Sequence, residues 1–259
     1  MHESAELLTK AEGSPAAVVN AGGKGPVVLV CEHASRRLPE TVGTLGLSEE
    51  ALVSHIAWDP GALAVAEHLS SLLDAPLVYQ RFSRLVYDCN RPPEAPGAMP
   101  ETSEIYDIPG NRALSQHEKD RRTRGLYLPF HAAVSDLLDE RGKAGLESII
   151  VTMHSFTPVY MGRERAVEIG ILHDEDSRVA DAMLIAAEGN TDYDIRRNEP
   201  YGPADGVTHT LIKHGLARGL KNVMIEVRND LIRDEDGQRV MAGLLAELLG
   251  SALKDRPNT

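Results

Sequence analysis

The sequence predicts an α/β fold of three layers, in which a mixed, largely parallel sheet is flanked by helices. Two observations carry this prediction. Apolar, β-branched runs alternate with segments of helical periodicity. The chain of 259 residues with 42% hydrophobic side chains is also long enough to bury an ordinary core. We expect a loosely held lead-in at 1–25 and one α/β domain at 26–255.

The first half of that domain begins with a strand, a helix and a second strand. The run PVVLVCEH at 26–33 is apolar and β-branched, which predicts a buried strand. The segment DPGALAVAEHLSSLL at 59–73 predicts a helix, because Asp59 can cap it and Pro60 suits its first position. The run APLVYQ at 75–80 predicts the second strand.

The rest of the chain continues this alternation after one irregular stretch. Residues 82–111 are rich in proline and arginine, and a structureless stretch of about 30 residues in a compact domain is usually functional or mobile. A polar helix follows from about Ser115 and is interrupted near Pro129. Further strands are expected at 146–155, 166–174 and 222–227, and further helices at 176–188, 206–217 and 235–253.

Composition excludes several classes of function. The net charge of −12 argues against a nucleic-acid surface. Cys31 and Cys89 are too few for a disulfide framework, and no run approaches the roughly 18 apolar residues of a membrane helix. The polar N-terminus lacks a signal pattern. We therefore expect a cytoplasmic protein, monomeric or a small homo-oligomer, that acts on a small molecule rather than on nucleic acid or a membrane.

Three chemically capable residues fall at or near the ends of predicted strands. They are His33, His154 and Glu226. Ligands of parallel sheets bind beyond the carboxyl ends of the strands, so the fold would bring these side chains to one edge. A catalytic zinc ion takes three ligands of the His, Asp or Glu kind and leaves one position for water.

We predict that His33, Asp59 and His154 hold one zinc ion and that Glu226 is the general base. Each residue also has a structural interpretation. Asp59 is a good helix cap, Glu226 could pair with Arg228 or Arg197, and either histidine could simply finish a strand. His55 is the main rival for the third ligand position.

Several stretches together resemble the N-formylglutamate amidohydrolase family. They are VLVCEHAS (28–35), HIAWDPGA (55–62), RFSRLVYDCNRP (81–92), MHSFTP (153–158), NEPYGPADGVTHTLIKHG (198–215) and NVMIEVRNDL (222–231). The resemblance implies a phosphorylase/hydrolase-like fold related to zinc carboxypeptidases and aspartoacylase. It maps the same three ligands and base onto this chain. One departure is that Arg36 stands where the carboxypeptidase branch has a ligating glutamate three residues after its first histidine.

The resemblance also implies a substrate side. In VYDCNRP, Asn90 and Arg91 would grip an α-carboxylate, because the arginine fork suits that group. Arg84 would polarise the scissile carbonyl, and Asp88 would orient an arginine or a histidine ligand. The alternative is a loop held together by salt bridges. Further wall residues are expected at Arg163, Arg165, Tyr201, Gly202, Thr208, His209, His214, Arg228 and Asn229.

The expected reaction is hydrolysis of the amide of a small anionic N-acyl amino acid, with N-formyl-L-glutamate giving formate and L-glutamate. Alternatives are a related deacylase, a muropeptide amidase, and a non-catalytic binding domain on the same fold. A cysteine hydrolase built on Cys31 and His33 is disfavoured, because a cysteine in an apolar strand is usually a buried small hydrophobe. The AGGKG string at 21–25 precedes a strand, so it lacks phosphate-loop geometry.

Overall fold

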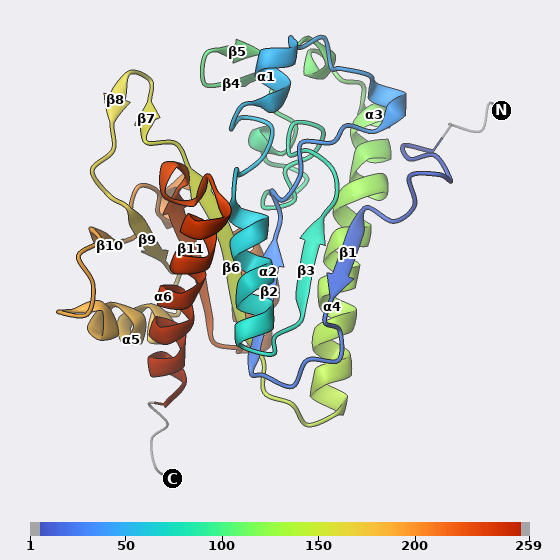
Figure 1. Ribbon diagram of the computed structural model, residues 1–259. Helices are drawn as coiled ribbons and strands as arrows, with labels where there is room; N and C mark the ends of the chain where they lie inside the picture. The colour runs from blue at the N-terminus through green and yellow to red at the C-terminus, as the bar shows by residue number, and fades with distance from the viewer. Residues whose placement is uncertain (1–5, 255–259) are drawn as a thin grey trace.

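The computed structural model, which describes residues 6–254, is built on one seven-stranded sheet (Figure 1). The strand order is β1-β3-β2-β6-β11-β9-β10. The strands are β1 (Ala16–Val19), β2 (Val27–Cys31), β3 (Leu77–Gln80), β6 (Ile149–Phe156), β9 (Ile169–Leu172), β10 (Ile195–Arg197) and β11 (Asn222–Arg228). The four central strands β3, β2, β6 and β11 are parallel, whereas β1 and β9 run antiparallel to their inner neighbours. The prediction of a mixed, largely parallel sheet is confirmed.

Helices cover both faces of the sheet, as Figure 1 shows. One face packs against α2 (Ala62–Leu72), α5 (Arg178–Ala187) and α6 (Glu235–Lys254), and the other packs against α4 (Leu128–Lys143). Alternate side chains of β2 enter the two cores, with Leu29 on the α2 side and Val30 on the α4 side. A strand buried on both faces explains why this stretch of sequence is apolar without alternation.

Shorter elements surround the carboxyl end of the sheet. They are α1 (Glu49–Val53), α3 (Gln116–Arg122), the hairpin β4–β5 (Thr102–Ser103 and Tyr106–Asp107) and the hairpin β7–β8 (Val159–Tyr160 and Arg163–Glu164). A π-helical turn at Thr123–Tyr127 joins α3 to α4, and Pro129 then stands in the first turn of α4. The expected interruption near Pro129 is this turn.

The segment 82–111 contains only short elements, and buried polar side chains hold it in place. Arg122 donates to the carbonyl of Val86 and to Asn111, which in turn donates to the carbonyl of Leu85. His131 of α4 contacts the carbonyl of Cys89 at 2.9 Å. The long irregular stretch is therefore an ordered layer over the sheet edge.

Three expectations differ from the structure. The lead-in is not loosely held, because β1 pairs with β3 and Glu12 is buried; positions 1–5 lie outside the described residues. The helix expected at 59–73 begins at Ala62, and its N-cap is Gly61 with φ +80°. Glycine is required there, since a Cβ would stand 2.4 Å from the carbonyl oxygen of Ile232. The segment 206–217 forms a π-helical turn at Leu211–Gly215 and a short 3-10 turn rather than a regular helix.

Candidate metal centre and active-site cavity

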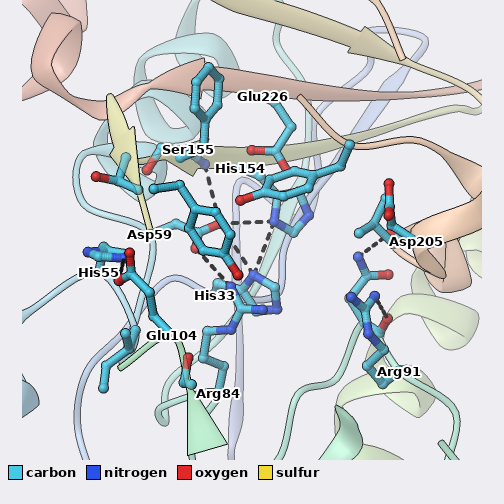
Figure 2. Close-up of a pocket in the computed structure, with 18 residues that line it drawn as sticks. His33, His55, Asp59, Arg84, Arg91, Glu104, His154, Ser155, Asp205 and Glu226 are labelled. Carbon is cyan, nitrogen blue, oxygen red and sulfur yellow. Dashed lines mark hydrogen bonds and ion pairs between the residues drawn. The ribbon is translucent and has the colours of Figure 1, made fainter. Parts of the chain in front are cut away.

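The carboxyl ends of β2, β6 and β11 bring the three strand-end residues together (Figure 2). His33 follows β2 by two residues, and His154 lies in β6. Glu226 lies in β11 directly opposite His154 in the parallel register. The loop before α2 supplies Asp59, whose backbone N–H donates to the carbonyl of His33 at 2.9 Å. The left-handed turn at Gly61 separates Asp59 from the helix, so its carboxylate turns toward the histidines instead of capping α2.

Three atoms of these residues converge on one point. The Nδ1 atoms of His33 and His154 are 3.2 Å apart, and they lie 3.3 and 3.0 Å from Oδ2 of Asp59. All three residues are buried, and they form the one such group of potential metal ligands within residues 6–254. Ligand atoms at about 2.0–2.1 Å from a tetrahedral zinc ion are separated by about 3.3 Å. The donor set and its spacing therefore fit a zinc ion.

The opposite nitrogen of each histidine meets a carboxylate. Nε2 of His33 lies 2.7 Å from Oδ1 of Asp88, and Nε2 of His154 lies 3.2 Å from Oε2 of Glu32. A carboxylate accepts a proton-bearing nitrogen, so both Nδ1 lone pairs are left to face the shared point. This arrangement is the usual support of a metal-binding histidine.

Glu32 is a candidate site residue that the sequence analysis missed. Its side chain is fully buried. Burial alone would raise the pKa of this carboxyl, but the charge of the adjacent His154 outweighs burial and lowers it to about 2. The signal in the sequence was an acid inside an apolar strand end, next to a predicted ligand. Such an acid is almost never fully buried unless it is paired.

Glu226 has the properties of a general base. Its side chain is buried, and this burial raises the pKa of the carboxyl. The charge of His154 opposes the increase and the charge of Asp59 adds to it, and the resulting pKa is about 7. Its Oε2 atom is buried without a hydrogen-bond partner among the described residues. Arg228 pairs with Glu168 and Asp230 instead, so the ion-pair interpretation of Glu226 does not hold for that arginine.

Arg197 offers no ion pair to Glu226 either, since it binds Asp181. Its other neighbour is His173, at the carboxyl end of β9. Because β9 runs antiparallel to β11, this end lies at the opposite edge of the sheet from the converging ligands.

The loop 82–111 contributes two arginines to the site. The guanidinium of Arg84 forms two ion pairs, one with Oδ1 of Asp59 at 3.4 Å and one with Oδ2 of Asp88 at 3.0 Å. Its side chain is 30% exposed. Arg91 donates to the carbonyls of Asn90 and Gly206 and has no carboxylate partner within the described part of the chain. Both interpretations of this loop therefore apply, because Arg84 sits in a salt-bridge network and Arg91 makes no close ion pair within the described residues.

A cavity of about 290 Å³ opens above these groups. It is small enough to suit a small ligand. The predicted site residues that line it are His33, Asp59, Arg84, Asn90, Arg91, His154, Tyr201 and Glu226. His55 also lines it, but its Nε2 atom pairs with Glu104 at 2.9 Å and stands apart from the three converging atoms.

Of the predicted wall residues only Tyr201 lines this cavity among the residues described, and the others do not: Arg163, Arg165, Gly202, Thr208, His209, His214, Arg228 and Asn229. The guanidinium of Arg165 lies 4.6 and 4.8 Å from the ring centres of Tyr160 and Tyr201. Thr208 donates to Asp174. His209 and His214 belong to a separate cluster, in which Tyr127 contacts His209 at 2.9 Å and His131 contacts His214 at 2.8 Å.

Cys31 lies fully buried in the core on the α2 side. Burial, with the charges of Asp59 and Glu32, raises the pKa of its thiol well above the usual range. A thiolate nucleophile is therefore not available at this position.

The chain is similar to proteins of one family along most of its length. A family model described as N-formylglutamate amidohydrolase matches residues 25–233. No curated protein is similar to the chain at a significant level. The crystal structure of gene product Atu2144 from Agrobacterium tumefaciens is 62% identical, with a TM-score of 0.94 over 96% of this chain and 98% of that one. An N-formylglutamate amidohydrolase from Ralstonia eutropha JMP134 is 20% identical and shares the fold, with a TM-score of 0.66 over 93% of this chain and 97% of that one.

Proposed function

The chain belongs to the N-formylglutamate amidohydrolase family, and on that premise we propose that it is a zinc-dependent hydrolase of the amide bond of a small N-acyl amino acid. The observation that supports zinc most directly is the convergence of His33, Asp59 and His154, with a carboxylate behind each imidazole. N-formyl-L-glutamate, the substrate in the family's name, is the first compound to assay.

Zinc, when bound by these three residues, supplies Lewis acidity that lowers the pKa of water to about 7. Glu226 lies opposite His154 and has a pKa near 7, so it can take a proton from the attacking water and return it to the leaving nitrogen. A pKa matched to that of the proton donor suits this double task. Formate and an amino acid would be the products of a formyl substrate.

Arg84 and Arg91 divide the anionic parts of the substrate between them. Arg84 is fixed by Asp59 and Asp88 beside the converging ligands, where it can stabilise negative charge that develops on the acyl oxygen. Arg91 makes no close ion pair within the described residues and can bind the α-carboxylate in the two-point manner of a guanidinium. Asn90 acts indirectly, because its amide group is bonded to the backbone of Val207 and Thr210 and so fixes this wall.

The experiment that tests this function combines metal analysis with a substrate screen. Purified protein is analysed for bound metal, stripped with a chelator, reloaded with zinc and assayed on N-formyl, N-acetyl and N-succinyl amino acids. We expect about one zinc ion per chain, activity lost on stripping and restored on reloading. Hydrolysis that is indifferent to the chelator, or no hydrolysis of any N-acyl amino acid by the reloaded protein, would contradict the proposal.

The alternatives make different predictions in the same experiment. A muropeptide amidase would hydrolyse muropeptides in preference to free N-acyl amino acids, and a binding domain would hold ligand without turnover. Among residues 6–254 there is no helix that is both long and apolar enough to cross a membrane. The small anionic substrate and the cytoplasmic location stay predictions of the sequence.

A further inference from the structure

The cavity wall formed by His55 and Glu104 is chemically unlike the wall formed by the arginines. In the view of Figure 2, His55 and Glu104 lie on one side of the three converging ligands, and Arg91 lies on the other. Building on the proposed function, we infer that this wall receives the side chain of the substrate and selects one that ends in a hydrogen-bond donor, such as a carboxamide, over one that ends in a second carboxylate.

Glu104 is held firmly at the edge of the cavity. Its Oε2 atom pairs with Nε2 of His55 at 2.9 Å, and its Oε1 atom accepts the backbone N–H of Met161 at 3.2 Å. Only 12% of its side chain is exposed, although the next residue, Ile105, is 76% exposed. Each carboxylate oxygen can accept a second hydrogen bond, so both contacts leave Glu104 able to accept a donor from a ligand.

The position of Glu104 in the chain is unfavourable for this residue type. It is the first residue of the two-residue connection between β4 and β5 and has φ +53°. Glycine, asparagine or aspartate usually occupies such a position. A glutamate here carries a conformational cost that a better turn residue would avoid.

The cationic groups of the cavity suffice for one carboxylate. Arg84 is already bound to Asp59 and Asp88, which leaves Arg91 for the α-carboxylate. Arg165, which the sequence analysis placed at a second carboxylate, lies among aromatic rings outside this cavity. The cavity is lined by four carboxylates, of which Asp59 would be compensated by the zinc ion, so that Glu104, Asp205 and Glu226 remain beside the two arginines.

The charge of the His55–Glu104 pair does not favour a second carboxylate in either state of the imidazole. The pair carries one negative charge when His55 is neutral and none when it is protonated. Because a formyl group has a single carbon atom, the acyl side of the substrate needs little of the 290 Å³ cavity, and the remaining space is available to the amino-acid side chain. A side-chain carboxamide would donate to Glu104, whereas a carboxylate of the same shape would be repelled by it.

The test uses N-formyl-L-glutamine and N-formyl-L-glutamate, which differ only at the end of the side chain. We expect the zinc-loaded protein to hydrolyse the glutamine compound with a kcat/KM at least about tenfold higher, within the range that pocket contacts achieve. The variant Glu104→Gln keeps an acceptor for Met161 and removes the charge, so this ratio should fall toward one or below. Calorimetric binding of the products L-glutamine and L-glutamate should follow the same order.

Asp107→Asn is the matched control, since it removes one negative charge from the same hairpin at an exposed position outside the cavity. It should leave the ratio unchanged.

A ratio taken on one sample is independent of the fraction of active protein, and a purely structural role of Glu104 would lower both rates equally. The inference fails if the parent protein prefers N-formyl-L-glutamate, or if Glu104→Gln leaves the ratio as it was. If the zinc-loaded protein hydrolyses no N-acyl amino acid, the proposed function itself has failed.

Discussion

The chemistry proposed for this site depends on single side chains whose burial changes their acidity. Glu226 is the clearest case. It lies in β11, burial raises its pKa to about 7, and one oxygen is without a hydrogen-bond partner in the described structure. An ordinary surface glutamate could not take a proton at neutral pH and release it again, whereas this one is matched to that task.

Replacing Glu226 by glutamine should separate catalysis from metal binding. The amide cannot accept the proton of the attacking water, so we expect kcat to fall by about 100- to 10,000-fold with the zinc content unchanged. The measurement is steady-state turnover of the best substrate together with metal analysis. Glu235→Gln, on the exposed start of α6, is the matched control and should behave as the parent. Parental turnover by Glu226→Gln would show that another group is the base.

Glu32 should act through His154 rather than on the substrate. It lies behind the imidazole, 3.2 Å from Nε2, and is not among the residues that line the cavity. Removing the charge of such a supporting carboxylate typically weakens metal binding by 10- to 100-fold. We therefore expect Glu32→Gln to lower zinc affinity by about that factor in a competition with a chromophoric chelator. Glu67→Gln, on the exposed face of α2, serves as control, and equal affinities for both variants would contradict the role.

At the scale of elements, the sequence predicted which strands carry the site but not how every neighbouring side chain turns. The carboxyl ends of parallel strands meet at one edge of the sheet. The proximity of His33, His154 and Glu226 could therefore be predicted from their positions in the sequence alone. Asp59 was placed in the right group, but the left-handed turn at Gly61, set by tertiary contact with Ile232, was not visible in the sequence.

Other elements show why such prediction stops short of complete. The strand β1 is only four residues long and half exposed, so its pattern is too weak to distinguish it from a loop. The expected helix over His209 and His214 becomes a π-helical turn, and an altered turn changes which face a side chain occupies. These two histidines contact Tyr127 and His131 and do not line the cavity.

The contact between α4 and the π-helical turn at Leu211–Gly215 should make stability depend on pH. His131 and His214 contact each other at 2.8 Å, and burial lowers their pKa values to about 3 and about 4. Unfolded histidine titrates near pH 6.5. The unfolded chain therefore binds these protons first, and the stability provided by the neutral pair is present above pH 6.5 and is lost as the pH falls toward 4 and 3.

From pH 7.5 to 5.0 this linkage should lower the free energy of unfolding by about 2 kcal/mol for each histidine. His131→Gln removes one titrating group and keeps an N–H donor for the carbonyl of Cys89. We expect the metal-free variant to lose about 2 kcal/mol less over this pH interval than the parent, measured by urea unfolding. His117→Gln, exposed on α3, should show the parental pH dependence. An unchanged slope in His131→Gln would mean that the pair does not control acid stability.

At the scale of the whole molecule, the proposed metal ligands link segments that are distant in the sequence. His33 follows β2 and His154 lies in the adjacent strand β6, whereas Asp59 comes from the connection to α2. No single element could hold these atoms within 3.3 Å of one another. The site forms only when the sheet and its helices have assembled, so a metal that binds it favours the folded state of the entire chain.

Zinc should therefore raise the thermal unfolding temperature, and the effect should grow with the logarithm of its concentration relative to the Kd. At a free zinc concentration about 1,000 times the Kd, linkage predicts about 4 kcal/mol of added stability. Asp59→Asn removes the anionic ligand while preserving the shape of the side chain, so its melting temperature should respond much less to zinc; Asp107→Asn should respond like the parent. Differential scanning calorimetry with and without zinc measures all three proteins. A shift of the same size in Asp59→Asn would place the stabilising ion elsewhere, because the folded state then gains zinc affinity without the carboxylate that lies nearest to both imidazoles.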